Sequence, residues 1–148
     1  MDLQSTDYQN PYAPQGLNGL NDPYPNGYVD RPAYYPQTIT FSADGLFLNQ
    51  AIPVDTMADF ILRGIVVSQA SGFTIRLLDA SGTYLSNAAL LAEVLSTQIA
   101  TSWPIWPEVP FPAGSRIAAD YFINTGVSPV TLQVVYLGVN RFRLPATT

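Results

Sequence analysis

The sequence predicts an all-β protein: an antiparallel β-sandwich or barrel, preceded by an extended N-terminal arm, with one short helix as a possible addition. Two observations support the sheet structure. From residue 37 onward, short stretches alternate apolar and polar side chains, which is the pattern of half-buried strands. Turn signals separate these stretches at intervals of about ten residues, a spacing typical of sandwiches and barrels. The arm is indicated by the first 36 residues, which lack this pattern and hold six of the thirteen prolines.

The size and charge of the chain indicate one domain that resides in an assembly. A length of 148 residues fits one domain with an appendage, and 47% hydrophobic residues suffice for a core. Charged residues make up only 11%, against roughly 25% in typical soluble domains. All six cations are arginines. A surface this poor in charge favours a protein that is covered by neighbours over one that is merely unusual in composition.

The chain contains neither cysteine nor histidine. Without cysteine there is no disulfide, thiol nucleophile or thiolate metal site, and without histidine there is no imidazole base or ordinary zinc or iron site. Most familiar hydrolase and oxidoreductase sites are thereby excluded. We therefore expect a protein that is not an enzyme and that carries no cofactor.

Other features of the composition bear on partners and location. The net charge of −5 and the lack of a cationic cluster argue against nucleic-acid binding. No apolar run approaches the length that crosses a bilayer, so we expect no membrane partner. The N-terminal sequence MDLQSTDYQN is acidic and polar, unlike a signal peptide, so we expect synthesis in a cytoplasm without export by that route.

Residues 1–36 form the predicted arm. The segment has too few aliphatic side chains to offset its ordering entropy, and its prolines disfavour helices and central strands. Tyrosine is an amphipathic anchor that interfaces favour, so we expect the arm to become ordered along a neighbouring subunit; a disordered tail is the alternative. The partner-binding candidates are its six tyrosines: Tyr8, Tyr12, Tyr24, Tyr28, Tyr34 and Tyr35.

Residues 37–148 form the predicted sandwich domain, and its first half contains several strands. Residues 38–41 alternate, and a turn at 43–45 leads into residues 46–48. Residues 58–69 are almost continuously apolar, which predicts a strand buried on both faces or one bent at Gly64. Residues 73–77 alternate as a half-buried strand.

The middle of the domain departs from this alternation. Residues 84–101 place apolar side chains at helical spacing, which indicates a short helix or an irregular strand. The following segment, TSWPIWPEVPFPAG, is too rich in proline for a central strand, so we expect an edge segment or a rim loop. Its aromatic residues Trp103, Trp106 and Phe111 either close one end of the core or form a contact patch.

The last third is the most regular, with alternating strands expected at residues 117–123, 132–137 and 139–144. Isolated arginines on the predicted sheets are candidates for an interface, because a guanidinium forms bidentate ion pairs and stacks on tyrosine rings. They either receive a tyrosine-rich arm from a neighbour, or each is a solvated strand residue or pairs within its own subunit with Asp59, Asp79 or Asp120. The candidates are Arg63, Arg76, Arg116, Arg141 and Arg143, with Trp103 and Trp106 as possible further interface residues.

Carboxylates and glycine turns give little sign of chemistry. A glycosidase would use two carboxylates in different environments, but nothing in the spacing of the acidic residues assigns such roles. Asp44 and Asp79 lie in glycine turns, yet neither stretch has the alternating carboxylates of a calcium loop. No glycine-rich phosphate-binding motif is present. We expect ordinary turns, no metal site and no catalytic residues.

Residues 41–143 resemble small jelly-roll virion proteins of tailed bacteriophages. The similarity is carried by DGLFLNQAIPVDTMADFILRGI, FTIRLLDASGTYLS, FPAGSRIAADYFI and VTLQVVYLGVNRF. The resemblance implies a jelly-roll sandwich that stands on the capsid or at the head–tail collar, often as a trimer, with a terminal arm that ties it to the shell.

The resemblance therefore implies a capsid decoration or cement protein on the exterior of a virion assembled in the host cytoplasm. Its partners would be the major capsid protein or other virion proteins, together with copies of itself, most simply as a homotrimer. Two alternatives remain: a neck, collar or tail protein of the virion, and a carbohydrate-binding sandwich for host attachment in which Trp103 and Trp106 stack on sugar rings.

Overall fold

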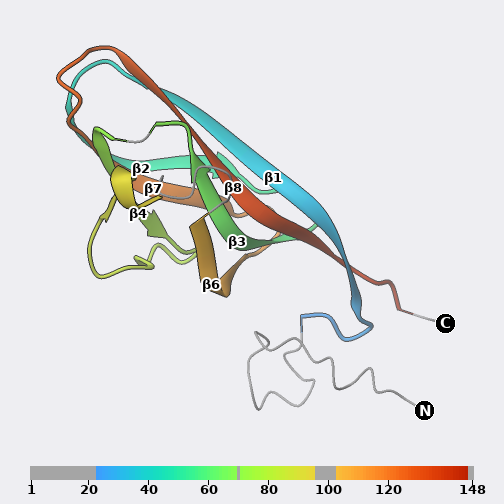
Figure 1. Cartoon of the computed structure of the whole chain (residues 1–148). Coiled ribbons are helices and arrows are strands. Elements are labelled where there is room, and N and C mark those ends of the chain that lie inside the picture. Colours follow the sequence, from blue (N-terminus) through green and yellow to red (C-terminus); the bar gives the residue numbers. More distant parts are fainter. Residues whose placement is uncertain (1–22, 70, 96–102, 147–148) are drawn as a thin grey trace.

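The structure is a computed structural model that describes residues 23–69, 71–95 and 103–146. These residues form two four-stranded antiparallel sheets that pack face to face as a β-sandwich (Figure 1), which confirms the predicted fold class. The arm tyrosines Tyr8 and Tyr12 lie outside the described residues.

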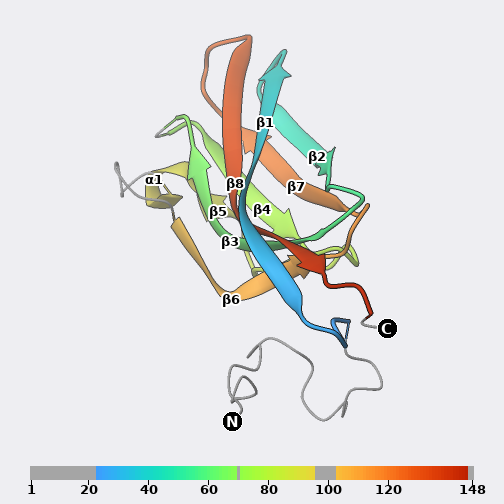
Figure 2. The ribbon, with the colours of Figure 1, turned by 90° about the vertical axis from the view of Figure 1, so that its right-hand side faces the viewer.

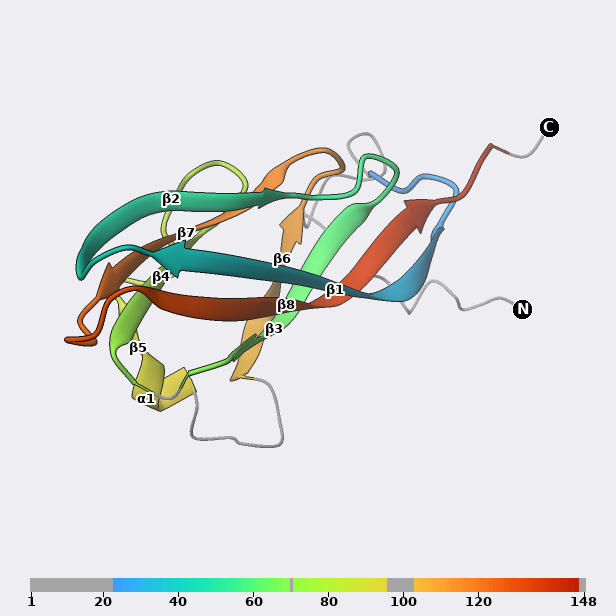
Figure 3. The same ribbon diagram turned by 90° about the horizontal axis from the view of Figure 1, so that it is seen from above.

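The first sheet contains, in order across it, β1 (Tyr28–Phe41), β8 (Val130–Arg143), β3 (Asp59–Val67) and β6 (Trp103–Phe111). β1 and β8 run side by side over their full lengths (Figures 2 and 3). β3 is buried over most of its length, as its apolar run predicts. β6 carries three prolines and lies at the edge of the sheet, where a missing backbone donor is tolerated, as predicted.

The second sheet contains β2 (Gly45–Pro53), β7 (Arg116–Ile123), β4 (Phe73–Leu78) and β5 (Leu90–Leu91), again in order across it. β4 shows the strict alternation that its sequence predicts, whereas the alternation of β7 is interrupted at Ala118, which is buried together with Ile117 and Ala119. A four-residue helix, α1 (Ala92–Leu95), follows β5 and confirms the short helix.

The pairing of the strands is that of a jelly roll. β1 pairs with β8, β2 with β7, β3 with β6 and β4 with β5, so the chain forms one long antiparallel hairpin. The hairpin rolls up because successive pairs alternate between the two sheets, and β3–β8 and β4–β7 contacts join the pairs within each sheet. Eight strands connected in this way are a jelly roll.

The core lies between the sheets and is rich in aromatic side chains. Among its largest fully buried members are Phe41, Phe60, Phe111, Tyr121 and Tyr136. The hydroxyls of Tyr121 and Tyr136 are buried without a hydrogen-bond partner. Aromatic rings thus fill part of a core that is otherwise built from leucine, isoleucine and valine.

The contact between β3 and β8 depends on a close backbone approach. The register of β3 against both neighbours shifts between Leu62 and Gly64, which confirms the predicted bend at Gly64. Opposite the bend lies Gly138 of β8, where an added Cβ would stand 1.9 Å from the carbonyl oxygen of Ile61. Only a residue without a side chain fits there.

Two expectations about the boundaries of elements are wrong. β1 begins at Tyr28, so the arm boundary placed after residue 36 is wrong for residues 28–36, which are strand. Proline at positions 32 and 36 is compatible with this, because β1 is an edge strand. The strands expected at 132–137 and 139–144 are one continuous strand, β8.

Candidate functional site

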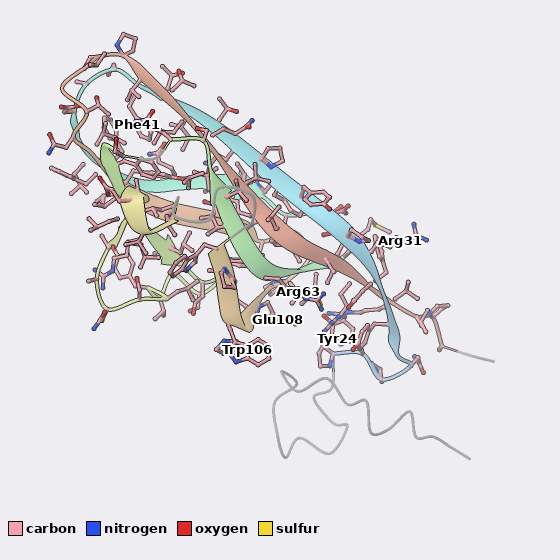
Figure 4. The ribbon with its side chains drawn as sticks, in the orientation of Figure 1. Tyr24, Arg31, Phe41, Arg63, Trp106 and Glu108 are labelled. Carbon is pink, nitrogen blue, oxygen red and sulfur yellow. The ribbon has the colours of Figure 1, made fainter. Side chains whose placement is uncertain are left out.

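The most elaborate polar site lies on the outer face of the first sheet, where the described chain begins. Figure 4 shows Tyr24, Arg63 and Glu108 near this end of the sandwich, with Phe41 at the opposite end. We call its centre the Arg141 cluster, which consists of Tyr24, Tyr28, Asp30, Asp59, Arg141 and Arg143.

A tight turn delivers the tyrosines to this cluster. The backbone N–H of Gly27 donates a 2.9 Å hydrogen bond to the carbonyl of Tyr24, and Gly27 has a φ of 90°. The N–H of Leu144 in turn donates to the carbonyl of Gly27 at 3.0 Å. The turn is therefore held against the end of β8, and this fixes the position of Tyr24 relative to the sheet.

Arg141 is the centre of the cluster. Its Nε and Nη2 donate to the two carboxylate oxygens of Asp30, each at 2.8 Å, and the residue is only 3% exposed. Its guanidinium carbon lies 4.0 Å from the ring centroid of Tyr28 and 5.6 Å from that of Tyr24. Burial lowers the pKa of Arg141, but the hydrogen bonds and charge of Asp30 outweigh burial and raise the pKa overall. The guanidinium thus stays charged.

Asp59 joins the turn to the sheet. Tyr24 donates its hydroxyl proton to Oδ2 of Asp59, while the N–H of Ala113 donates to Oδ1 at 2.8 Å. Nη2 of Arg143 lies 3.9 Å from the same Oδ2. Burial and then the hydrogen bond and charge of Asp59 raise the pKa of Tyr24 well above its ordinary value. Tyr24 therefore remains a neutral donor.

A second ion pair extends the network to the edge strand β6. Nε of Arg63 lies 3.1 Å from Glu108 Oε1, and Nη2 of Arg63 lies 3.8 Å from Asp30 Oδ2. Glu108 also lines the groove described below, so the Arg141 cluster and the groove adjoin.

The tyrosine–arginine contacts expected from the sequence occur, but within one chain. Tyr24 and Tyr28 stack on the arginines of their own sheet. Tyr35 packs edge-on against Phe60 and donates its hydroxyl to Asn140 at 2.9 Å. Of the four predicted arm tyrosines that the structure describes, only Tyr34 presents most of its side chain to solvent.

Arg76 belongs to a separate site on the second sheet. Its guanidinium stacks on Tyr84 at 3.8 Å and donates to the carbonyl of Ser86 at 3.1 and 3.2 Å. The Tyr84 hydroxyl donates to Asp120 at 2.5 Å. The structure therefore does not bring Arg76 together with Arg63, Arg141 and Arg143.

A groove of about 630 Å³ runs between β6 and the connection from β4 to β5. Leucine, isoleucine, tryptophan and proline side chains dominate its lining; from β6 they include Trp103, Pro104, Ile105, Trp106 and Pro107. Phe111 is fully buried and Trp103 packs against the core, so the two ends of β6 are both anchored in the core. Trp106 is 78% exposed, and it contributes to a surface patch.

The two turn aspartates behave as ordinary loop residues. Asp44 accepts hydrogen bonds from the N–H groups of Thr125 and Gly126, at 3.1 and 2.9 Å. Asp79 accepts from the N–H groups of Ser81 and Thr83, both at 2.9 Å. These backbone bonds explain why aspartate occupies both turns.

Each carboxylate of the main site has at least one ion-pair or hydrogen-bond partner, although Oε2 of Glu108 is buried without one. Asp30 is held by Arg141, Asp59 by Tyr24 and Ala113, and Glu108 by Arg63. Within residues 23–69, 71–95 and 103–146, no group of three or more acidic residues is arranged to hold a metal ion. The arrangement is suited to fixing the chain in place, since each charge already has a partner.

Sequence reasoning missed Asp30 and did not foresee the pairing of Glu108 with Arg63. Asp30 and Asp59 each lie opposite Arg141 in register, on either side of β8. Only the strand order could have revealed this, because the residues are far apart in the chain.

Comparison with protein-family models, with curated proteins and with solved structures gives no significant match. Among the described residues, no helix is long and apolar enough to span a membrane. The Arg141 cluster and the adjoining groove are therefore interpreted from their own geometry.

Proposed function

We propose that this chain is a structural subunit of a bacteriophage particle, most specifically a decoration or cement protein that attaches to the shell of major capsid protein through its N-terminal segment. The observation that carries the proposal is the Arg141 cluster, which fixes the root of that segment to a rigid sandwich. The sequence resemblance to phage virion proteins supports the same assignment.

The attachment of the N-terminal segment at the Arg141 cluster determines how firmly the segment would hold the sandwich on the shell. A segment of 22 residues can extend to roughly 70 Å, which is far enough to reach neighbouring capsomers. Because Tyr24 and Arg141 hold its root on the first sheet, the sandwich cannot swing freely once the segment has bound. Tyr8 and Tyr12 would then supply aromatic burial on the shell.

The cost of ordering favours several tethers acting together. Fixing one backbone residue costs roughly 1–2 kcal/mol, so a single arm of this length binds only if it buries a large area. A trimer presents three arms, and binding of the first raises the effective concentration of the others. We therefore propose a trimeric attachment unit.

The test is to delete residues 1–22 while retaining Tyr24 and the whole Arg141 cluster. Particles incubated with this variant should bind far fewer copies of it than of the wild type. The number of bound copies per particle is measured by stoichiometric gel electrophoresis and electron microscopy. A full-length variant with Tyr8→Ser and Tyr12→Ser should lose occupancy as well, whereas Gln4→Ser with Gln9→Ser is the matched control. Unchanged occupancy of the deletion variant would refute attachment through the arm.

The groove beside β6 favours a second candidate function, carbohydrate binding. Exposed tryptophan rings stack on sugar faces, and Trp106, which lines this groove and is 78% exposed, projects from β6 (Figure 4). A glycan array that shows binding by the wild type, and loss with Trp106→Ala, would support this role. Copy number per particle separates a shell location from a neck, collar or tail location.

A further inference from the structure

The outer face of the second sheet carries a row of side chains that crosses all four strands, with exposed apolar residues on β2, β7 and β5 and Thr74 on β4. Leu46, Phe122 and Leu91 are 63%, 47% and 51% exposed, and Leu48, two residues along β2, is 58% exposed. The strand register places Leu46 opposite Phe122, Phe122 opposite Thr74, and Thr74 opposite Leu91. We call these five residues the apolar face.

The members of the apolar face are direct neighbours. Residues opposite each other on adjacent antiparallel strands share one side of the sheet, with Cβ atoms about 5 Å apart. The adjacent pair Phe47 and Tyr121 points the other way, into the core. The row is therefore continuous across the sheet, with one threonine between Phe122 and Leu91, and an exposed patch this apolar on a folded domain marks an interaction site.

The charge on this face is balanced. No member of the apolar face is ionisable, and the next row contains Arg76 and Asp120, which lie opposite each other in register and compensate each other. The whole chain carries a net charge of −5, so copies repel one another across most orientations. Contact through the apolar face adds no charge of its own to that repulsion, because none of its members is ionisable.

The dimensions of the sheet suit a modest interface. Its strands have nine, eight, six and two residues and are spaced about 4.8 Å apart, so they cover roughly 400 Å² in projection. This area lies below the roughly 800 Å² per partner of a standard interface and fits an oligomer that dissociates on dilution. Two sheets of this kind pack face to face with their strands about 30° apart.

We propose that the apolar face is the surface through which a second copy of this chain binds, with Phe122 at its centre. The contact buries the row Leu46–Phe122–Leu91 of one copy against the same face of the other copy. This inference does not depend on the arm or on the capsid, because it concerns the free protein.

The test is sedimentation velocity of the full-length protein over a wide range of concentration. The wild type should sediment as an oligomer that dissociates on dilution. Phe122→Glu and Leu46→Glu should each raise the dissociation constant by at least about tenfold, because a carboxylate would be buried without a partner. Met57→Glu is the matched control, since Met57 is exposed in the connection between β2 and β3.

Circular dichroism checks that each variant folds, and Phe122→Thr provides a milder change with high strand propensity if a charge there prevents folding. A wild type that remains monomeric at every concentration overturns the proposal. The proposal is also overturned if Phe122→Glu and Leu46→Glu raise the dissociation constant no more than Met57→Glu does. Loss of particle occupancy on deletion of residues 1–22 is a separate outcome, so this inference and the proposed function can fail independently.

Discussion

Arg141 and Asp30 form a two-pronged ion pair, with both N–O distances at 2.8 Å, between the last strand of the jelly roll and the first. The pair lies at the end of the sandwich from which the N-terminal segment departs. Tyr28 and Tyr24 cover the guanidinium, so Arg141 is shielded from water, whereas the side chain of Asp30 is 25% exposed. A bidentate pair in this setting specifies the position of the chain as well as contributing energy.

Replacing Arg141 by methionine should destabilise the protein strongly. Asp30 and Asp59 would lose the buried positive charge between them, and breaking a buried pair from one side costs roughly 3 kcal/mol or more. Urea unfolding measures the change. Arg31→Met is the matched control, because Arg31 is exposed and stacks only on Phe142 at 5.4 Å. Equal losses in the two variants would contradict the assigned role of the pair.

Substitution of Gly138 by alanine should be among the most damaging single changes in β8. The new methyl group would collide with the carbonyl of Ile61, a backbone atom that cannot rotate away. We expect a loss above about 3 kcal/mol, beyond ordinary overpacking. Gly82→Ala is the comparison, since it has open space and strains only its backbone at a φ of 86°. Similar unfolding free energies for both variants would refute the close approach.

Stability should fall in alkaline solution because of Tyr136. Burial raises the pKa of this hydroxyl to about 12, above the ordinary value of 10. Unfolded chains therefore release this proton above pH 10 while folded chains retain it, so folding weakens as pH rises from 10 to 12. Tyr136→Phe should show a shallower decline in urea unfolding over that range, with Tyr34→Phe as the exposed control.

The same variant tests the unpartnered hydroxyl at neutral pH. Since the Tyr136 hydroxyl is buried without a partner, its removal should leave stability equal or higher at pH 7. A large loss of stability would instead indicate that the hydroxyl is hydrogen-bonded in the core, for which the neighbouring Tyr121 hydroxyl is the candidate.

Asp44 should contribute stability in the opposite pH range. Backbone hydrogen bonds from Gly126 and Thr125 hold the pKa of this carboxyl below its ordinary value. Its stabilisation is therefore present at neutral pH and is lost as pH falls through the lowered pKa. Asp44→Asn should be less stable than the wild type at pH 7, and the difference should shrink in acid. A difference that is independent of pH would contradict this.

The sequence predicted those strands whose own residues alternate and whose faces are unambiguous, such as Phe73–Leu78 and Arg116–Ile123. It failed for Tyr28–Pro36, because prolines in an edge strand resemble the prolines of an unstructured arm. The sequence predicts that the tyrosines of that segment contact a partner, whereas Tyr35 packs on Phe60 of its own chain.

The sites were harder to predict than the strands. Asp30 and Arg141 are 111 positions apart, and no local spacing links them. The apolar face likewise combines Leu46, Phe122 and Leu91 from three strands, each of which alone shows only an isolated exposed side chain. Such sites become visible only when the order of strands in the sheet is known.

The jelly-roll pairing also determines when during synthesis this chain can fold. β1 has a single neighbour in its sheet, β8, and β2 has a single neighbour, β7. Both early strands therefore keep their hydrogen-bonding edges open until β7 and β8 have been synthesised. Closure of the sandwich consequently follows the synthesis of β8, and a product that ends before residue 130 leaves β1 with nothing to pair with.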